Sequence, residues 1–173
     1  MTAPSARAAV QLVDVWKEFV KRGRRVEALQ AVDVEIEENE FAALLGPSGC
    51  GKSTLLNMVA GFDVPTRGRA LFHGEPVLVP DPRRGVVFQE SALFPWYTVR
   101  DNLTFGPRTR GVRAADYEPK VRAYLDQVGL TGFESHYPAE LSGGMKQRVG
   151  IARVLVAEPE RLPMDKPFGS LDA

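Results

Sequence analysis

The chain has 173 residues, enough for one domain with a sizeable core. Its 22 basic and 22 acidic residues balance, so no basic excess indicates a nucleic-acid partner. The single cysteine, Cys50, excludes an internal disulfide framework and is typical of a reducing compartment. No apolar run approaches the ~20 residues that span a bilayer, and the N-terminus lacks a secretory signal. We therefore expect a cytoplasmic protein whose residues 1–9 are a disordered lead-in.

The first part of the chain has the pattern of strands. Val10–Trp16 and Ala31–Ile36 alternate apolar and polar residues and predict two strands. The apolar residues of the second strand share one face: Val32, Val34 and Ile36. Phe41–Leu45 is a short apolar run ending at Gly46, and it predicts a strand that is buried on both faces.

The next elements alternate between helix and strand. Lys52–Ala60 has apolar residues at helical spacing and predicts a helix. Arg69–Val79 contains the turn signal His73-Gly74 and predicts a hairpin. Gly85–Phe88 is a further candidate for a buried strand.

The pattern then becomes helical. Residues 98–105 and 115–128 predict helices, and Ser142 is the expected N-cap of a long helix that runs through Leu155. The chain thus combines a strand-rich N-terminal part, a phosphate-loop core and a helical insert between about residues 89 and 140. This order predicts an α/β fold.

Residues 46–54 read GPSGCGKST, which fits the pattern G-x-x-x-x-G-K-[ST] between a predicted strand and a predicted helix. Glycines let the backbone curl around phosphate oxygens, and the amides of the helix N-terminus face the anion. In this pattern Lys52 supplies charge to the β- and γ-phosphates, Ser53 ligates Mg²⁺ and Thr54 supports the α- and β-phosphates. A purely structural glycine turn is the alternative, and the complete pattern disfavours it. The candidate ATP-binding residues are Gly46, Pro47, Ser48, Gly49, Cys50, Gly51, Lys52, Ser53 and Thr54.

A second glycine motif, LSGGMKQR, occupies residues 141–148. Its serine is a helix cap, its two glycines allow close approach, and the free amides of the first turn face an anion. Two adjacent glycines in a first helical turn are costly, which disfavours a capped helix without a ligand. The candidate residues are Leu141, Ser142, Gly143, Gly144, Met145, Lys146 and Gln147.

Together with the phosphate loop, this motif resembles the signature of the ATP-binding-cassette (ABC) superfamily, and the resemblance covers nearly the whole chain. It implies a P-loop nucleoside triphosphate hydrolase core with an N-terminal antiparallel β-subdomain. Residues 10–173 would form a single, incomplete domain with a helical subdomain at about 90–140 and without the C-terminal strands of the family. The resemblance also implies a head-to-tail dimer, in which the signature closes over the γ-phosphate of ATP bound to the opposite subunit. ATP and Mg²⁺ are the implied cofactors.

Further residues take roles from this resemblance. Gln89 matches the glutamine loop, which contacts Mg²⁺ and signals to the membrane subunit, and Asp165 matches the aspartate that holds Mg²⁺ through water. With Ser53 they make up the expected metal set. Phe19 matches the aromatic side chain that stacks on adenine; a core phenylalanine is the alternative. The loop that crosses the dimer interface matches Ser170, Leu171 and Asp172.

The C-terminal segment departs from the family pattern. Lys166 stands at the position of the catalytic glutamate, beside Gln89 and Asp165 in the candidate catalytic set. A protonated ammonium cannot accept a proton from water, and the loss of a general base slows a reaction ~10²- to 10⁴-fold. We therefore predict ATP binding with weak or absent hydrolysis. Arg161 and Pro163 predict a poorly formed strand, and the switch histidine of the family has no counterpart.

The stretches SALFPWYTVRDNLTFG and HYPAELSGGMKQRVGIAR resemble importer ATPases, especially the nitrate, sulfonate and taurine group. The implied function is that of an ATP-binding subunit which couples ATP binding and hydrolysis to import of a small solute, an anion such as nitrate, sulfonate or taurine. The implied partners are a second copy, integral membrane permease subunits and a solute-binding protein, at the cytoplasmic face of the cell membrane. Trp96 is expected near the coupling surface, with packing of the helical subdomain as the alternative. Two other functions stay open: a truncated, non-hydrolysing ATP-binding module or inactive fragment, and a non-transport cassette in repair or translation.

Overall fold

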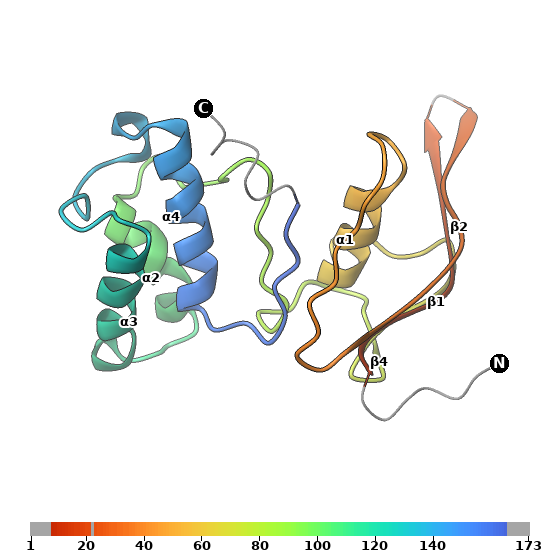
Figure 1. The fold of residues 1–173 in the computed structure, drawn as a ribbon, viewed down its shortest axis with the longest axis horizontal. Helices are drawn as coiled ribbons and strands as arrows, with labels where there is room; N and C mark the ends of the chain where they lie inside the picture. The colour runs from red at the N-terminus through yellow and green to blue at the C-terminus, as the bar shows by residue number, and fades with distance from the viewer. Residues whose placement is uncertain (1–7, 22, 166–173) are drawn as a thin grey trace. The chain divides into compact units, whose positions relative to one another are not determined.

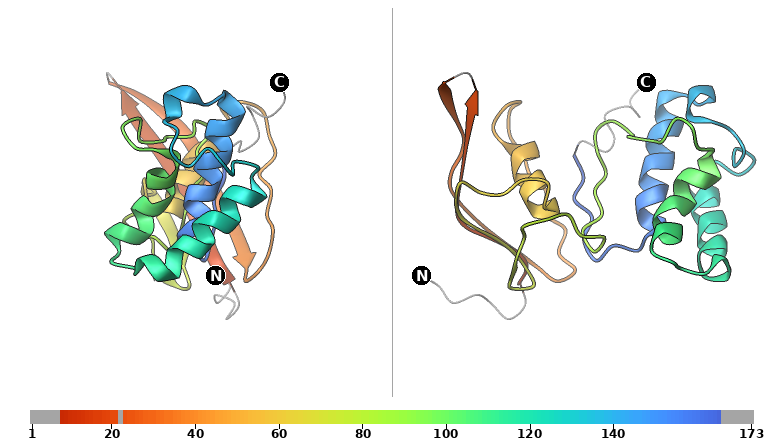
Figure 2. Two further views of the ribbon diagram at one scale, coloured as in Figure 1. Left: turned by 90° about the vertical axis from the view of Figure 1, so that its left-hand side faces the viewer. Right: turned by 180° about the vertical axis from the view of Figure 1, so that it is seen from behind.

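The computed structural model describes residues 8–21 and 23–165 (Figures 1 and 2). Its contacts divide the chain into two compact units, residues 1–81 and 82–173. Each unit has a hydrophobic core of its own. In the colours of Figure 1 the first unit runs from red to yellow-green and the second from green to blue.

The first unit is built on a four-stranded antiparallel sheet of order β2-β1-β3-β4. Its strands are β1 (Ala8–Lys21), β2 (Arg24–Glu37), β3 (Arg67–Phe72) and β4 (Glu75–Pro76). Alternation places apolar residues opposite one another across β1 and β2, as in the pair Leu12 and Val34. Both predicted strands are confirmed, and both are longer than predicted because the hairpin continues beyond the alternating runs.

A tight turn joins β3 to β4. Its central residues, His73 and Gly74, have φ angles of 49° and 78°. Positive φ at both positions is the geometry of the two-residue hairpin turns that match the twist of antiparallel strands. The predicted hairpin is confirmed, although its second strand is short.

One helix, α1 (Lys52–Ala60), completes the first unit with the bounds predicted for it. Figures 1 and 2 show α1 beside the sheet, and its apolar side packs into the core. The predicted apolar face of β2 packs against this core from Val32, Val34 and Ile36. The buried core members are Val10, Leu12, Val15, Leu29, Leu55, Met58, Val59, Ala70, Phe72 and Val77. Burying such side chains stabilises the fold by about 1.5–3 kcal/mol each.

The apolar run Phe41–Leu45 differs from its prediction. It forms no strand, and Phe41 and Leu45 are both 92% exposed. A strand that is buried on both faces needs hydrogen-bonded neighbours and covering layers, and nothing in the described part of the chain pairs with this run. The prediction of a buried strand is therefore wrong for the described structure.

The second unit is a helical bundle with an irregular strand-like segment. Its helices are α2 (Val99–Thr109), α3 (Ala114–Gln127), the short 3₁₀ helix η1 (Pro138–Glu140) and α4 (Gly143–Val156). These confirm the three helices predicted beyond residue 89. Their apolar faces meet in a core made of Val99, Leu103, Tyr117, Val121, Leu125, Leu130, Leu141, Val149, Ala152 and Val156.

Two extended segments of the second unit run in parallel. Val87 donates to the carbonyl of Pro163 at 3.0 Å, and Asp165 donates to the carbonyl of Val87 at 2.9 Å. The pairing is limited to two isolated bridges, at Arg84 with Arg161 and at Val87 with Met164. Because proline has no N–H to donate, Pro163 interrupts the ladder. The predicted weak strand around Pro163 is confirmed.

Candidate nucleotide-binding site

The phosphate loop turns into α1 at Gly51, the N-cap residue, whose φ is 95°. A Cβ at this position would lie 2.6 Å from the carbonyl oxygen of Ala28 and 2.7 Å from Cδ2 of Leu29. Both the backbone conformation and the lack of space therefore require glycine. Leu55 donates to the carbonyl of Gly51 at 2.9 Å and closes the first turn. The second glycine of the motif thus fixes how the helix leaves the loop.

The ammonium group of Lys52 lies against the loop itself. Its Nζ donates to the carbonyl oxygens of Gly46 and Pro47 at 2.8 and 2.7 Å. It also lies 3.4 Å from Sγ of Cys50, an exposed free thiol. These contacts hold a positive charge at the turn that the motif predicts to surround phosphate.

The N-terminus of α1 is suited to an anion. Gly51 provides no side-chain cap, and the first turn contains no acidic residue. The free amides of a helix start and its dipole both favour negative charge. Ser53 is exposed in this first turn, so its hydroxyl is open to a ligand, and Thr54 next to it is partly buried. The loop therefore combines free amides, one ammonium and one exposed hydroxyl in the pattern that fits a triphosphate.

Phe19 lies on β1, where its cross-strand partner is Val26. Its side chain is 43% exposed and belongs to neither core, so the alternative of a core phenylalanine is wrong. The Nζ of Lys17 lies 5.1 Å from the centroid of the ring, and the same ammonium pairs with Asp63 at 2.5 Å. An exposed ring is what stacking on a base requires; the adenine role itself stays a prediction.

The glycine motif of the second unit begins α4. Ser142 is its N-cap, and its Oγ accepts a hydrogen bond from the amide of Met145 at 3.3 Å. A Cβ added at Gly143 would meet nothing within 4 Å, so the start of the helix is open. Leu141 is buried in the core just before the cap. Lys146 donates its backbone amide to Ser142 as the helix continues.

Gln89 and Asp165 follow neighbouring segments of the second unit. Asp165 donates its backbone amide to Val87, two residues before Gln89. Because the two segments are parallel, both residues lie toward the same end of the pair. Gln89 is exposed and Asp165 is partly buried. The structure thus places both predicted metal-site residues at the same end of two paired segments.

The predicted site residues are divided between the two units. The phosphate loop and Phe19 belong to the first unit, whereas Gln89, Asp165 and residues 141–147 belong to the second. Lys166 and the predicted interface loop, Ser170, Leu171 and Asp172, lie outside the described residues.

Sequence analysis missed one polar side chain in the middle of α2. Asn102 is completely buried and makes four hydrogen bonds to the residues before the helix. Asparagine is a poor helix former, so its place inside a predicted helix was the available signal.

Among residues 8–21 and 23–165, none of the helices combines the length and the apolar character required to cross a bilayer. The same described residues contain no group of three or more His, Cys, Asp or Glu placed to hold a metal ion.

The motif GPSGCGKST, a glycine-rich loop that leads into the N-terminus of α1, defines a nucleotide-binding protein of the P-loop class. The sequence model of the family described as ABC transporter matches residues 29–169. The chain therefore belongs to the ABC transporter family, whose ATP-binding members are transport ATPases.

Relatives and solved structures agree with this membership. The chain is 52% identical over 151 residues to the taurine import ATP-binding protein TauB of Jannaschia sp., covering 87% of this chain and 56% of the relative. It is 51% identical over 168 residues to the spermidine/putrescine import ATP-binding protein PotA of Frankia alni, covering 95% of this chain and 36% of the relative. A dimeric ATP-binding cassette in a post-hydrolysis state, bound to ADP and Pi, has a TM-score of 0.84 and 31% identity. That comparison covers 95% of this chain and 76% of the cassette.

Proposed function

We propose that the chain is the ATP-binding subunit of an ABC importer and that residues 46–54 bind the phosphates of ATP. The observation that supports this most directly is the geometry at Gly51 and Lys52. The left-handed glycine exposes the start of α1, and the lysine ammonium lies at the same turn. An anion bound there would meet free amides and a positive charge together.

Magnesium would be held beside the phosphates. Mg²⁺ prefers oxygen ligands and keeps several waters, so one or two protein groups are sufficient. The Ser53 hydroxyl is exposed at the start of α1, and the Gln89 amide and the Asp165 carboxylate follow neighbouring segments of the second unit. The resemblance to the family supports these three groups as the protein ligands of the metal, and the ion would neutralise charge on the phosphates.

A second copy would complete each site. The start of α4 offers a capped helix terminus and open space at Gly143, which suits a phosphate approaching from another subunit. The structurally similar cassette was solved as a dimer bound to ADP and Pi. We propose a head-to-tail dimer in which Leu141–Gln147 of one copy face the ATP of the other.

Hydrolysis is the part of the function that depends on position 166, where Lys166 replaces the expected general base. Two ATP molecules would pull the two copies together, and hydrolysis would release them and drive transport through conformational change. The competing function is an ATP-binding module without turnover. It is favoured by one specific observation, the ammonium side chain at position 166.

The solute is proposed from the relatives. The chain spans 56% of a taurine relative and 36% of a polyamine relative at nearly equal identity, so identity alone does not select the solute. Following the importer-like stretches of the sequence, we propose a small anion such as nitrate, a sulfonate or taurine. The partners would be permease subunits and a solute-binding protein, and the chain would lie at the cytoplasmic face of the cell membrane. The balance of 22 basic and 22 acidic residues does not favour a role on nucleic acid.

ATP binding tests this function directly. The chain is titrated with Mg²⁺-ATP and with a non-hydrolysable analogue, and hydrolysis is measured on the same samples. Lys52→Ala removes a charge-assisted contact of about 1.5–3 kcal/mol and should weaken binding roughly 10- to 100-fold. Lys120→Ala is the matched control, because Lys120 pairs with Glu158 on the helical surface of the second unit. Equal affinity of the Lys52 variant and the unaltered chain contradicts the proposal.

A further inference from the structure

A short segment of the second unit, residues 88–92, lies along α4 and contains Gln89. At its first residue, the carbonyl of Phe88 accepts a hydrogen bond from α4 at 3.2 Å. Residues three positions apart are neighbours on a helix surface. Three such residues of α4 face the segment: Gln147, Gly150 and Arg153. The helix is therefore in a position to determine where the Gln89 side chain lies.

The middle contact is a close approach of two backbones. A Cβ added at Gly150 would lie 3.2 Å from the carbonyl oxygen of Ser91 and 3.5 Å from its Cα and Cβ. Glycine inside a helix is destabilising relative to alanine, so its presence there needs a reason. The closeness of the segment supplies that reason, because a side chain at position 150 would press against it.

The third contact holds a strained residue. Ala92 has a φ angle of 45°, in the left-handed region that residues other than glycine rarely adopt. Nη1 of Arg153 donates to the carbonyl oxygen of Ala92 at 2.9 Å. The same guanidinium lies 5.4 Å from the ring centroid of Phe94, and burial lowers the pKa of Arg153 below its usual value. Hydrogen bonds from a charged donor are among the stronger ones, so this bond can offset the strain at Ala92.

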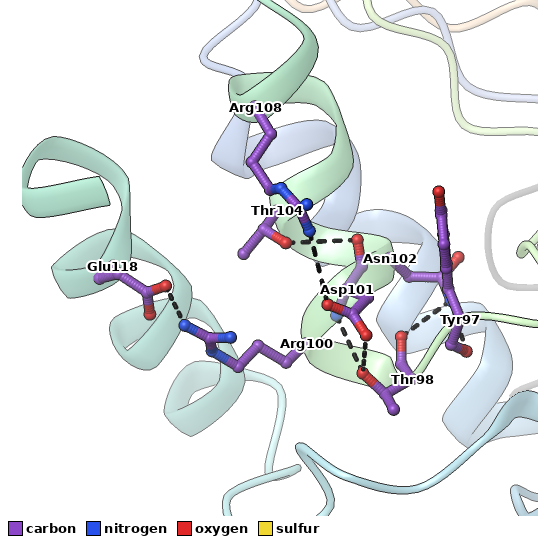
Figure 3. Close-up of polar contacts among 8 residues, drawn as sticks. All are labelled: Tyr97, Thr98, Arg100, Asp101, Asn102, Thr104, Arg108 and Glu118. Carbon is purple, nitrogen blue, oxygen red and sulfur yellow. Dashed lines mark hydrogen bonds and ion pairs between the residues drawn. The ribbon is translucent and has the colours of Figure 1, made fainter. Parts of the chain in front are cut away.

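The chain beyond the segment is fixed to α2. Asn102 is completely buried there, and its Oδ1 accepts from the amide of Phe94 at 2.9 Å. Its Nδ2 donates to the carbonyls of Tyr97 and Thr98 at 3.1 and 2.9 Å, and Figure 3 shows Asn102 with these two residues. Because the chain after residue 92 is held in this way, the turn at Ala92 determines the course of the residues before it.

We propose that Arg153 is a positioning residue for Gln89: by holding the left-handed turn at Ala92, it sets where the Gln89 amide meets the Mg²⁺ of bound ATP. The inference rests on the proposed function, since that function supplies ATP and its metal. Arg153 itself contacts neither of them; it acts through the backbone of residues 89–92. Because Arg153 lies on the helix that begins at the glycine motif, the position of Gln89 depends on α4.

The Mg²⁺ dependence of ATP binding tests this role. The full chain and its variants are titrated with ATP in excess Mg²⁺ and again in EDTA, and the ratio of the two affinities measures the contribution of the metal. Arg153→Met should lower this ratio about 10-fold, as is typical for residues that orient metal ligands, and should leave the affinity in EDTA unchanged. Gln89→Ala should lower the ratio at least as far. The double variant should be no lower than Gln89→Ala alone, because Arg153 acts only through Gln89.

A matched control and a rescue are both available. Nη2 of Arg110 donates to the carbonyl of Ala157 at 2.9 Å, so Arg110→Met removes the same kind of hydrogen bond from a carbonyl outside residues 88–92. Its affinity ratio should equal that of the unaltered chain. Adding Ala92→Gly to Arg153→Met should restore the ratio roughly 3-fold, because glycine adopts the left-handed conformation without support.

If Arg153→Met does not fold, Ala92→Val decides. Ala92 is exposed, so a larger side chain there disturbs no core. A β-branched residue tolerates a positive φ poorly, and the turn should therefore change its conformation. The affinity ratio should then fall about 10-fold in a folded protein, and an unchanged ratio contradicts the proposal.

Other results also overturn the proposal. An unchanged ratio in Arg153→Met, or losses that multiply in the double variant, exclude the positioning role. An equal loss of affinity in Mg²⁺ and in EDTA shows that Arg153 serves the fold alone. If Gln89→Ala leaves the ratio unchanged, this inference fails together with the metal role of Gln89, while ATP binding at residues 46–54 stands. A chain that does not bind ATP contradicts the proposed function itself.

Discussion

The side-chain amide of Gln147 donates a hydrogen bond to the carbonyl oxygen of Phe88 at 3.2 Å. Gln147 is 2% exposed within α4, and Phe88 directly precedes the exposed Gln89. The bond ties the helix that starts at the glycine motif to the segment that leads into Gln89. A hydrogen bond therefore connects Gln147 of the glycine motif to Phe88, 59 positions earlier in the sequence, within the second unit.

Gln147→Leu should lower the stability of the protein. It keeps a side chain of similar size but removes the amide that donates to Phe88, so a stability loss of about 1 kcal/mol is expected. Chemical denaturation of the full chain measures it. Gln127→Leu is the control, since Gln127 is exposed at the end of α3. Equal stability of the two variants contradicts the structural role of the bond.

Gly51→Ala should destabilise the first unit. A left-handed conformation costs a non-glycine residue of order 1–3 kcal/mol, and the added Cβ would also collide with Ala28 and Leu29. Gly49→Ala is the matched variant, because Gly49 has a φ of 83° but nothing within 4 Å of an added Cβ. Gly51→Ala should therefore lower the melting temperature further than Gly49→Ala, as read by circular dichroism. The reverse order contradicts the packing argument.

The regular elements could be predicted because local patterns determine them. Helix α1 follows from apolar spacing and a glycine start, and α4 from the cap at Ser142. The β3–β4 turn follows from His73-Gly74, since few residues tolerate positive φ at both positions. In each of these elements the backbone groups bond within the element or to the next strand along the chain.

The features that sequence did not predict depend on distant contacts. Phe41–Leu45 reads as a buried strand, yet burial is decided by neighbours that local pattern does not contain. The hydrogen bonds of the Asn102 side chain were not predicted, because they form only when the preceding loop folds back onto the helix, and the local sequence pattern does not show this. In the same way, nothing in the motif LSGGMKQR indicates that Gln147 reaches Phe88.

Ser142→Ala should weaken the start of α4. Its Oγ satisfies the amide of Met145, and loss of such a cap costs about 0.5–2 kcal/mol. Ser142→Asp should retain most of the stability, because aspartate also caps and its charge suits the helix N-terminus. Urea denaturation separates the two variants. If ATP-dependent dimerisation is lost in both variants although Ser142→Asp is stable, the serine itself contacts the nucleotide, as proposed.

Phe41→Ser and Leu45→Ser should reduce self-association without unfolding the protein. Both side chains are 92% exposed, so their truncation removes little packing, and surface changes of this kind usually stay within about 0.5 kcal/mol. Exposed apolar runs promote association between chains. Light scattering measures the association and thermal melting measures the stability. Leu12→Ser is the contrasting variant, since Leu12 is 2% exposed; it should unfold the first unit. A large stability loss in the Phe41 or Leu45 variant contradicts the exposed arrangement.

Lys166→Glu should convert ATP binding into turnover. The carboxylate would accept the proton of the attacking water, which a protonated ammonium is unable to do. Restoring a general base is expected to raise hydrolysis ~10²- to 10⁴-fold, measured as phosphate release under saturating Mg²⁺-ATP. Lys166→Gln is the matched control, because it removes the positive charge without supplying a base, and the double variant Lys52→Ala/Lys166→Glu should lose the gain. If Lys166→Gln and Lys166→Glu raise the rate equally, charge rather than proton transfer limits the reaction. If neither variant gains turnover in a folded protein that binds ATP, the missing base is not the limiting defect, and the non-hydrolysing binding module becomes the better description of this chain.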